Sequence, residues 1–276
     1  SDFLLMQNIS QTLAGRVAVT RLLPLSISEL KEDANIDTNT LMWKGFYPAV
    51  WGDGKSPDNV YDSYVSTYLQ RDVRQILNIK DLSLFQKFLT IVASRVGNVF
   101  IASSIASELG VDYKTIQSWM SILETSYTAF LLQPFHRNIG KRLTKTPKIY
   151  FYDIGLVCHL LGIENEQHIK NHPLRGAVFE NMVVCEMLKR RYNKGLKSNL
   201  YFYRDQSAEV DVIQEEAGSI KTYEIKSAER FNQEFTKSLS YVQKLLGDEI
   251  SSSYIIYSGE EEMKFKNFSL INYHNL

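Results

Sequence analysis

Hydrophobic and polar residues alternate along several short segments in the last third of the chain. Such alternation predicts strands, because successive side chains of a strand point to opposite faces. Two longer segments instead repeat apolar residues at spacings of three, four and seven, which predicts helices. The expected order is therefore helix, three strands, helix, strand. The helices are expected at 174–194 and 231–246, and the strands at 199–203, 209–213, 222–226 and 253–258.

Charged residues occupy one face of two of these expected strands. Alternation places Glu209 with Asp211, and Glu224 with Lys226. The residues expected on the opposite, core face are Val210, Val212, Tyr223 and Ile225. Hard divalent cations prefer oxygen ligands, so Asp211, Glu224 and a nearby carbonyl are candidates for holding Mg²⁺ or Mn²⁺. Lys226 is then a candidate for orienting a water or stabilising charge at a phosphate.

The expected helix at 174–194 carries a carboxylate on its apolar stripe. Glu180 lies three, four and seven residues before apolar positions, so it is predicted to point toward apolar surroundings. A carboxylate there needs a partner, and a metal or a lysine on the adjacent sheet would supply one. Glu186 falls on another face, near Lys189, and is expected to be solvated.

Two interpretations of these residues stay open. The order Glu180, Asp211, Glu224, Lys226 is that of a Mg²⁺-dependent nuclease site, whereas an ordinary hairpin would carry the same types as cross-strand pairs on its wet face. With the order of elements, the four residues resemble the restriction-endonuclease-like superfamily. The resemblance implies that all four are catalytic and that Asp211 and Glu224 hold the metal. Val210 stands where the superfamily usually has proline, and no clear catalytic glutamine motif follows Lys226.

The middle of the chain predicts three helices followed by two strands. The helices are expected at 83–95, at 101–110 with Gly110 closing it, and at 112–124 with Asp112 as its cap. The strand-like segments 127–135 and 149–153 flank a basic turn. This order is typical of a winged helix.

Winged helices often bind DNA, with the third helix in the major groove and the wing on phosphates. The alternative is an interdomain or protein-contact module, since the third helix contains no arginine. The candidate DNA-binding residues are Lys114, Gln117, Arg137, Lys141, Arg142, Lys145 and Lys148.

The N-terminal segment resembles the end of an AAA+-type ATPase domain. It contains an Ala-Gly-Arg turn at Arg16 and a Pro-Leu-Ser segment at Pro24. Together with 63–77 and 145–156, it resembles a bacterial and archaeal family that joins an ATPase domain, a winged helix and a restriction-endonuclease-like domain of unassigned function. The resemblance implies that ATP binds only in the intact parent protein, where Arg16 is a candidate to approach a phosphate. A plain surface arginine is the alternative.

The combined prediction is a multi-domain α/β protein. Its segments are an ATPase tail at 1–30, a connecting helical segment at 31–80, a winged helix at 81–165 and the endonuclease-like domain at 170–276. The expected function is DNA association with cleavage of DNA phosphodiesters using Mg²⁺ or Mn²⁺. The alternative is a catalytically inactive module that binds DNA or protein and is coupled to the ATPase domain in cis. A homo-oligomer is compatible with either.

Composition changes this picture little. The formal net charge of the 276 residues is zero, so nucleic-acid binding would depend on local basic clusters. The cysteines, Cys158 and Cys185, stand singly, which favours a reduced protein with buried thiols. No apolar run approaches the length of a membrane span, and the expected location is the cytoplasm.

Overall fold

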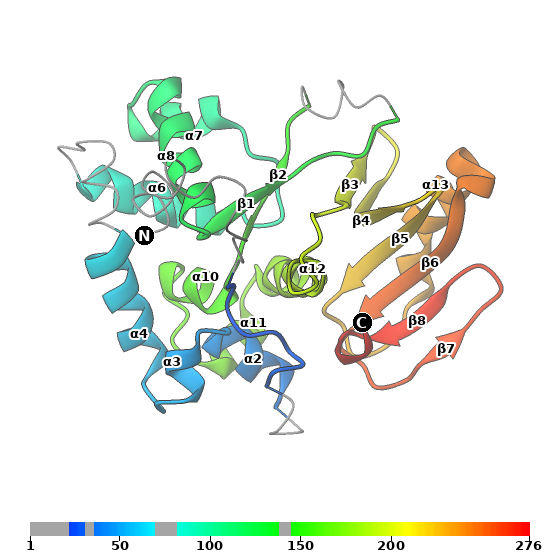
Figure 1. Cartoon of the computed structure of the whole chain (residues 1–276), viewed down its shortest axis with the longest axis horizontal. Coiled ribbons are helices and arrows are strands. Elements are labelled where there is room, and N and C mark those ends of the chain that lie inside the picture. The colour runs from blue at the N-terminus through cyan, green and yellow to red at the C-terminus, as the bar shows by residue number, and fades with distance from the viewer. Residues whose placement is uncertain (1–21, 31–35, 70–81, 138–144) are drawn as a thin grey trace, which may run out of the picture.

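The structure is a computed structural model that describes residues 22–30, 36–69, 82–137 and 145–276. Arg16, most of the expected ATPase tail, and Lys141 and Arg142 of the basic turn lie outside these residues. The described chain forms a mixed α/β structure with a helical part, residues 22–171, and a sheet part, residues 175–276 (Figure 1).

The helical part contains the three helices that the sequence predicts before the basic turn. Asp112 caps the third of them by accepting the N–H of Thr115 at 2.9 Å, and Gly110 ends the second with φ of 65°. The described helices of this part are α2 (Thr38–Lys44), α3 (Pro48–Trp51), α4 (Pro57–Ser63), a π-helical turn (Tyr64–Leu69), α6 (Leu82–Ser94), α7 (Ala102–Leu109), α8 (Tyr113–Thr125), α10 (Ile154–Leu160) and α11 (Glu166–Asn171).

Two strands follow α8 and form an antiparallel pair. Strand β1 (Ala129–Leu132) pairs with β2 (Lys148–Phe151), with Ala129 opposite Phe151. The predicted order of three helices and two strands is therefore present, on shorter strands than expected. All residues of β2 are buried, so this strand belongs to the interior.

The sheet part has the predicted order of helix, three strands, helix and strand. Its sheet runs in the order β3-β4-β5-β6-β8-β7, antiparallel from β3 to β5 and parallel from β5 through β6 to β8. The last two strands were not predicted. The elements are α12 (Arg175–Tyr192), β3 (Leu200–Arg204), β4 (Glu209–Glu216), β5 (Ser219–Lys226), a 3₁₀ turn (Gln233–Thr236), α13 (Lys237–Leu246), β6 (Ile250–Tyr257), β7 (Met263–Lys264) and β8 (Ser269–Asn272).

Helix α12 lies between the helical part and the sheet (Figure 1). One hydrophobic cluster joins the helical part, α12 and the sheet face that carries Val212, Tyr223 and Ile225. A second cluster lies beneath α13 and includes Val210 and Ile213. Because the first cluster continues across the expected boundary near residue 170, the two parts share a core.

The position of α12 explains one error of the sequence analysis. Glu186, predicted to be solvated, is 1% exposed and accepts the N–H of Ile27 at 3.0 Å. The buried Lys189 donates to the carbonyl of Leu25 at 2.7 Å and lies over the ring of Phe46. Periodicity predicts one buried face, whereas α12 has buried residues on nearly every side.

Two further expectations concern thiols and membranes. Cys158 and Cys185 are buried free thiols, as predicted. Each also donates to a backbone carbonyl. Within the described ranges, no helix is long and apolar enough to cross a membrane.

Candidate functional site

A group of buried and half-buried charges lies where β2, α12, β4 and β5 approach one another. It combines the predicted catalytic residues with two that the sequence analysis did not assign to the site. We call it the charge cluster, and its members are Lys148, Glu180, Glu209, Asp211, Glu224 and Lys226.

A β-bulge determines the position of Asp211. Tyr203 pairs with Val210 and Tyr201 with Ile213, so β4 has one residue more than β3 in this interval. Val210 and Ile213 therefore pack in the same cluster beneath α13, and the prediction that Val210 shares the face of Val212 is wrong. Bulges commonly redirect a side chain next to a functional site. Here the bulge contains Asp211, whose Oδ2 accepts the N–H of Ile225 at 2.7 Å.

Lys148 pairs with carboxylates from two elements of the sheet part. Its Nζ lies 3.2 Å from Glu180 Oε1 and 2.5 Å from Glu209 Oε1. The hydroxyl of Tyr150 donates to Glu180 Oε1 at 2.5 Å. Gly97 also approaches, since a Cβ built there would lie 3.5 Å from Glu180 Oε2. The predicted partner of Glu180, a lysine or a metal, is thus a lysine, and it comes from the helical part.

The position of Lys148 differs from its predicted place on an exposed wing. Its side chain is only 2% exposed, so it is unavailable to a DNA backbone. Lys148 and Tyr150 lie two residues apart on β2, where alternation places both on one face. That spacing was visible in the sequence, but the opposing carboxylates are 32 and 61 residues away along the chain.

Glu224 and Lys226 form the second half of the charge cluster. Lys226 Nζ lies 2.6 Å from Glu224 Oε1, as two residues on one face of β5 can. Glu224 is 5% exposed, and its Oε2 has no hydrogen-bond partner in the described structure. An unpaired buried carboxylate oxygen is costly and is therefore a sign of a functional position.

Burial and repulsion between carboxylates raise the pKa values of two glutamates in the charge cluster. Burial first, and the nearby Asp211 carboxylate second, raise the pKa of Glu180 to about 7. The same two causes raise the pKa of Glu224 to about 8, against the opposing effect of Lys226. Close carboxylates with raised pKa values are typical of sites that take up a proton or a cation.

The pKa values of the two lysines are raised as well, which keeps the lysines charged. Burial disfavours the ammonium of Lys148, but the carboxylates of Glu180, Asp211 and Glu209 outweigh it and hold the pKa of Lys148 above its usual value. Burial also opposes the charge of Lys226, and Asp211 and Glu224 outweigh it, so its pKa is raised. Both lysines are therefore charged at neutral pH.

The donor set fits a divalent cation held by few protein ligands. Among the described residues, no group of three or more His, Cys, Asp or Glu side chains is arranged to hold a metal ion. Mg²⁺, however, is usually bound through one or two carboxylates, with waters and substrate phosphates completing the shell. Asp211 and the unpaired Oε2 of Glu224 supply such a pair.

The other DNA-binding candidates that the structure describes are exposed residues of the helical part. Lys114, Gln117 and Lys145 are exposed, and Gln117 donates to the hydroxyl of Tyr113 at 2.8 Å. Arg137 is exposed and forms an ion pair with Glu249 of the sheet part. None of these residues belongs to the charge cluster.

Comparisons with known proteins match each part of the chain separately. Residues 35–167 match the family described as "Domain of unknown function (DUF8612)", and residues 175–276 match "Domain of unknown function (DUF4143)". The fold and these matches define a two-part α/β protein whose charge cluster joins a residue of the first matched domain to residues of the second.

Curated relatives match most of the chain. An uncharacterized protein of Mycobacterium tuberculosis is 29% identical over 257 residues, covering 91% of this chain and 55% of the relative. An uncharacterized protein of Haemophilus influenzae is 22% identical over 233 residues, covering 79% and 55%. The chain spans about half the length of the curated relatives it matches. No solved structure matches the chain.

Proposed function

We propose that the sheet part is a metal-dependent phosphodiesterase of the restriction-endonuclease-like type that acts on DNA. We further propose that the chain is the C-terminal portion of an AAA+-type ATPase. The observation that carries the first proposal is the buried Glu224 carboxylate, with its unpaired Oε2, beside Asp211 and Lys226. The element order of α12, three strands, α13 and β6 supports it.

The proposed roles follow from the contacts of each residue. Asp211 and Glu224 would hold Mg²⁺ or Mn²⁺, which when bound supplies Lewis-acid stabilisation at the phosphate. Lys226, a third exposed beside Glu224, orients the attacking water or stabilises charge on the phosphate oxygens. Glu180, on α12, is the third carboxylate of the site beside Asp211. Lys148 and Tyr150 donate hydrogen bonds to Oε1 of Glu180.

One observation favours a second candidate function. Lys148 already neutralises part of the acidic group, and among the described residues no three acidic, histidine or cysteine side chains are arranged to hold a metal ion. A restriction-endonuclease-like domain whose charges are internally paired would serve as a binding module for DNA or protein. The two candidates differ in whether the Asp211 and Glu224 pair binds a divalent ion.

The experiment measures Mn²⁺ binding by calorimetry and cleavage of labelled single-stranded, duplex and branched DNA. Glu224→Gln and Lys226→Ala are compared with the control Glu216→Gln, a half-buried glutamate at the other end of β4. The phosphodiesterase predicts that Glu224→Gln loses Mn²⁺ binding and cleavage, that Lys226→Ala loses cleavage, and that the control loses neither. Absence of Mn²⁺ binding refutes the metal-dependent proposal and favours the binding module, whereas Mn²⁺ binding without cleavage of any of the three DNA substrates refutes the phosphodiesterase activity.

A further inference from the structure

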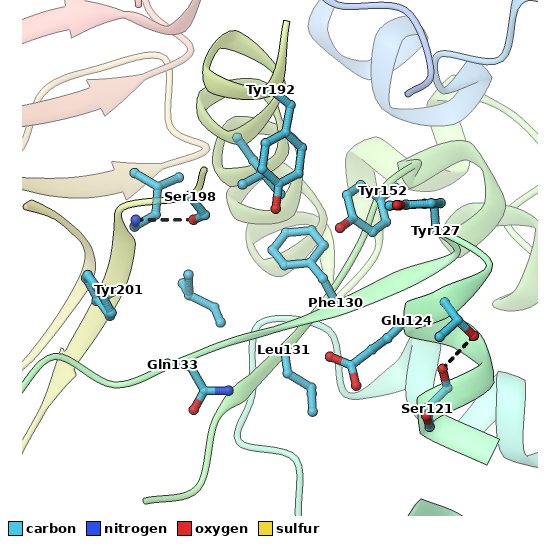
Figure 2. Close-up of a pocket in the computed structure, with 14 residues that line it drawn as sticks. Ser121, Glu124, Tyr127, Phe130, Leu131, Gln133, Tyr152, Tyr192, Ser198 and Tyr201 are labelled. Carbon is cyan, nitrogen blue, oxygen red and sulfur yellow. Dashed lines mark hydrogen bonds between the residues drawn. The ribbon is translucent and has the colours of Figure 1, made fainter. Parts of the chain in front are cut away.

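A cavity of about 610 Å³ lies between α8, β1, α12 and β3, and it shares no residue with the charge cluster. Aromatic side chains from several elements line it: Tyr127, Phe130, Tyr152, Tyr192 and Tyr201 (Figure 2). Its contribution from α12 comes from Leu188 and Tyr192, about two and three turns beyond Glu180. It is therefore a separate candidate binding site.

The backbone at Tyr127 indicates that its ring has a function in this cavity. Tyr127 has φ of 52°, the one positive value at a non-glycine position among the described residues. It occupies the left-handed position of a helix-ending motif, in which Tyr127 N–H donates to the carbonyl of Glu124 and Thr128 N–H to that of Leu123. Glycine is the usual residue there, because a side chain is strained in this conformation. A strained residue that lines a cavity indicates a binding role.

The charges that line the cavity select the chemistry of its ligand. Glu124 is the one ionisable carboxylate among the lining residues, and no lysine, arginine or histidine lines the cavity. Its side chain is exposed at the cavity, yet partial desolvation raises its pKa. Aromatic faces carry negative electrostatic potential and attract cations. A phosphate would therefore find no cationic side chain in the lining and one repelling carboxylate, whereas a cation would meet that carboxylate and several rings.

We propose that this cavity binds an arginine side chain from a peptide segment of a partner protein. The planar guanidinium stacks on aromatic faces and pairs with a carboxylate through two parallel N–H groups. Here Tyr127 and Phe130, whose ring also stacks on Tyr150, are the aromatic partners, and Glu124 is the carboxylate. Apolar neighbours of the arginine pack against the leucines of the wall, such as Leu131 and Leu188. The site belongs to neither the proposed metal chemistry nor the proposed DNA contacts.

The test measures binding of a short peptide, acetyl-Leu-Arg-Leu-amide, to the whole chain. The binding is monitored by the chemical shifts of the protein as the peptide is added. The matched probe replaces arginine by citrulline, which keeps the shape and removes the charge. We expect the arginine peptide to bind about tenfold more tightly than the citrulline peptide, with shifts confined to resonances of the cavity. A thymidine oligonucleotide serves as the third probe, because base stacking is the alternative use of an aromatic surface.

Two variants assign the binding to this cavity without threatening the fold. Glu124→Gln alters an exposed side chain and is expected to weaken arginine binding about tenfold. Tyr127→Gly relieves the backbone but removes the edge contact of the ring with Tyr152, so Tm is expected to change little while binding weakens several-fold. The control is Tyr113→Ala, at an exposed tyrosine of α8, the helix that carries Glu124, and this variant should bind normally. Equal affinity for both peptides, unchanged binding in both variants, or cavity shifts caused by the oligonucleotide alone would overturn the proposal.

Discussion

Replacing Lys148 by methionine tests whether the charge cluster joins the two parts of the chain. Methionine keeps the unbranched apolar stem of the lysine and removes the ammonium. The carboxylate of Glu180, 16% exposed, then retains only the hydroxyl of Tyr150 as a described hydrogen-bond partner. Glu209 loses a partner too, but it is 36% exposed and also lies 3.3 Å from Arg204. The effect should therefore arise mainly at Glu180.

The expected loss follows from the burial of the pair. Removing one partner of a buried ion pair destabilises a protein by about 3–5 kcal/mol. Glu180 can lower this loss by taking up a proton, since its pKa is already raised to about 7. Each pH unit below the pKa makes protonation easier by about 1.4 kcal/mol. We therefore expect Lys148→Met to destabilise the chain by about 3 kcal/mol at pH 8 and by less at pH 6.

Urea unfolding followed by tryptophan fluorescence measures this loss in a double-mutant cycle. The cycle compares Lys148→Met, Glu180→Gln and the double variant. We expect a coupling energy of about 1.5 kcal/mol or more between the two substitutions. In Glu180→Gln the side chain at position 180 is a neutral amide, so removing the ammonium of Lys148 no longer leaves a buried charge without its partner. Lys145→Met, at an exposed lysine just before β2, is the matched control and should lie within about 0.5 kcal/mol of the wild type.

A coupling energy below about 0.5 kcal/mol would refute the reasoning. Lys148 and Glu180 would then contribute independently, and the loss in Lys148→Met would report packing of its stem alone. The pH dependence is a second check, since a packing effect is the same at pH 6 and pH 8.

Three further predictions concern protons, the metal and the backbone. Glu180 and Glu224 have folded-state pKa values above 4.5, so unfolding releases protons, and stability should fall as pH rises from about 5 to 8, by up to about 1.4 kcal/mol per unit for each group. Urea titrations should show this slope flatten in the double variant Glu180→Gln, Glu224→Gln. Mn²⁺ at about one hundred times its dissociation constant should raise Tm by several degrees at pH 8 in the wild type but not in Glu224→Gln, as measured by calorimetry. Asn181→Ala should cost about 2–5 kcal/mol in urea unfolding, because the N–H and carbonyl of Phe151 each lose a buried hydrogen bond, while Mn²⁺ affinity of the folded protein stays unchanged.

Local patterns were sufficient to predict the elements on which the site is built. The periodicity of α12 and the alternation of β4 and β5 depend on residues close in sequence, as do the cap at Asp112 and the glycine at Gly110. The spacing Glu224, Ile225, Lys226 predicted that both charges share one face of β5, and the structure joins them there in an ion pair. These features follow from backbone geometry, so a single sequence reveals them.

The features that sequence reasoning missed depend on contacts between distant segments. A bulge inserts one residue into β4 relative to β3, and nothing in the local string around Asp211 distinguishes a bulge from a regular strand. The burial of Lys148 and Glu186 requires that the helical part cover α12, which amphipathic patterns do not specify. The basic residues near the turn therefore predict an exposed wing, although Lys148 is buried.

The raised pKa values of Glu180 and Glu224 connect the proposed metal to the proton balance of the charge cluster. Four carboxylates share this region with two lysines, and only Glu209 has an additional described cation, Arg204, at the edge. Burial and this excess of negative charge both favour the protonated forms, which is why the pKa values of Glu180 and Glu224 approach neutrality. A divalent ion held by Glu224 would relieve the same excess, so in the proposed enzyme its binding must displace protons. In the proposed enzyme Lys148 would then limit how much charge the metal has to balance, and a residue of the helical part would contribute to the affinity of a site on the sheet.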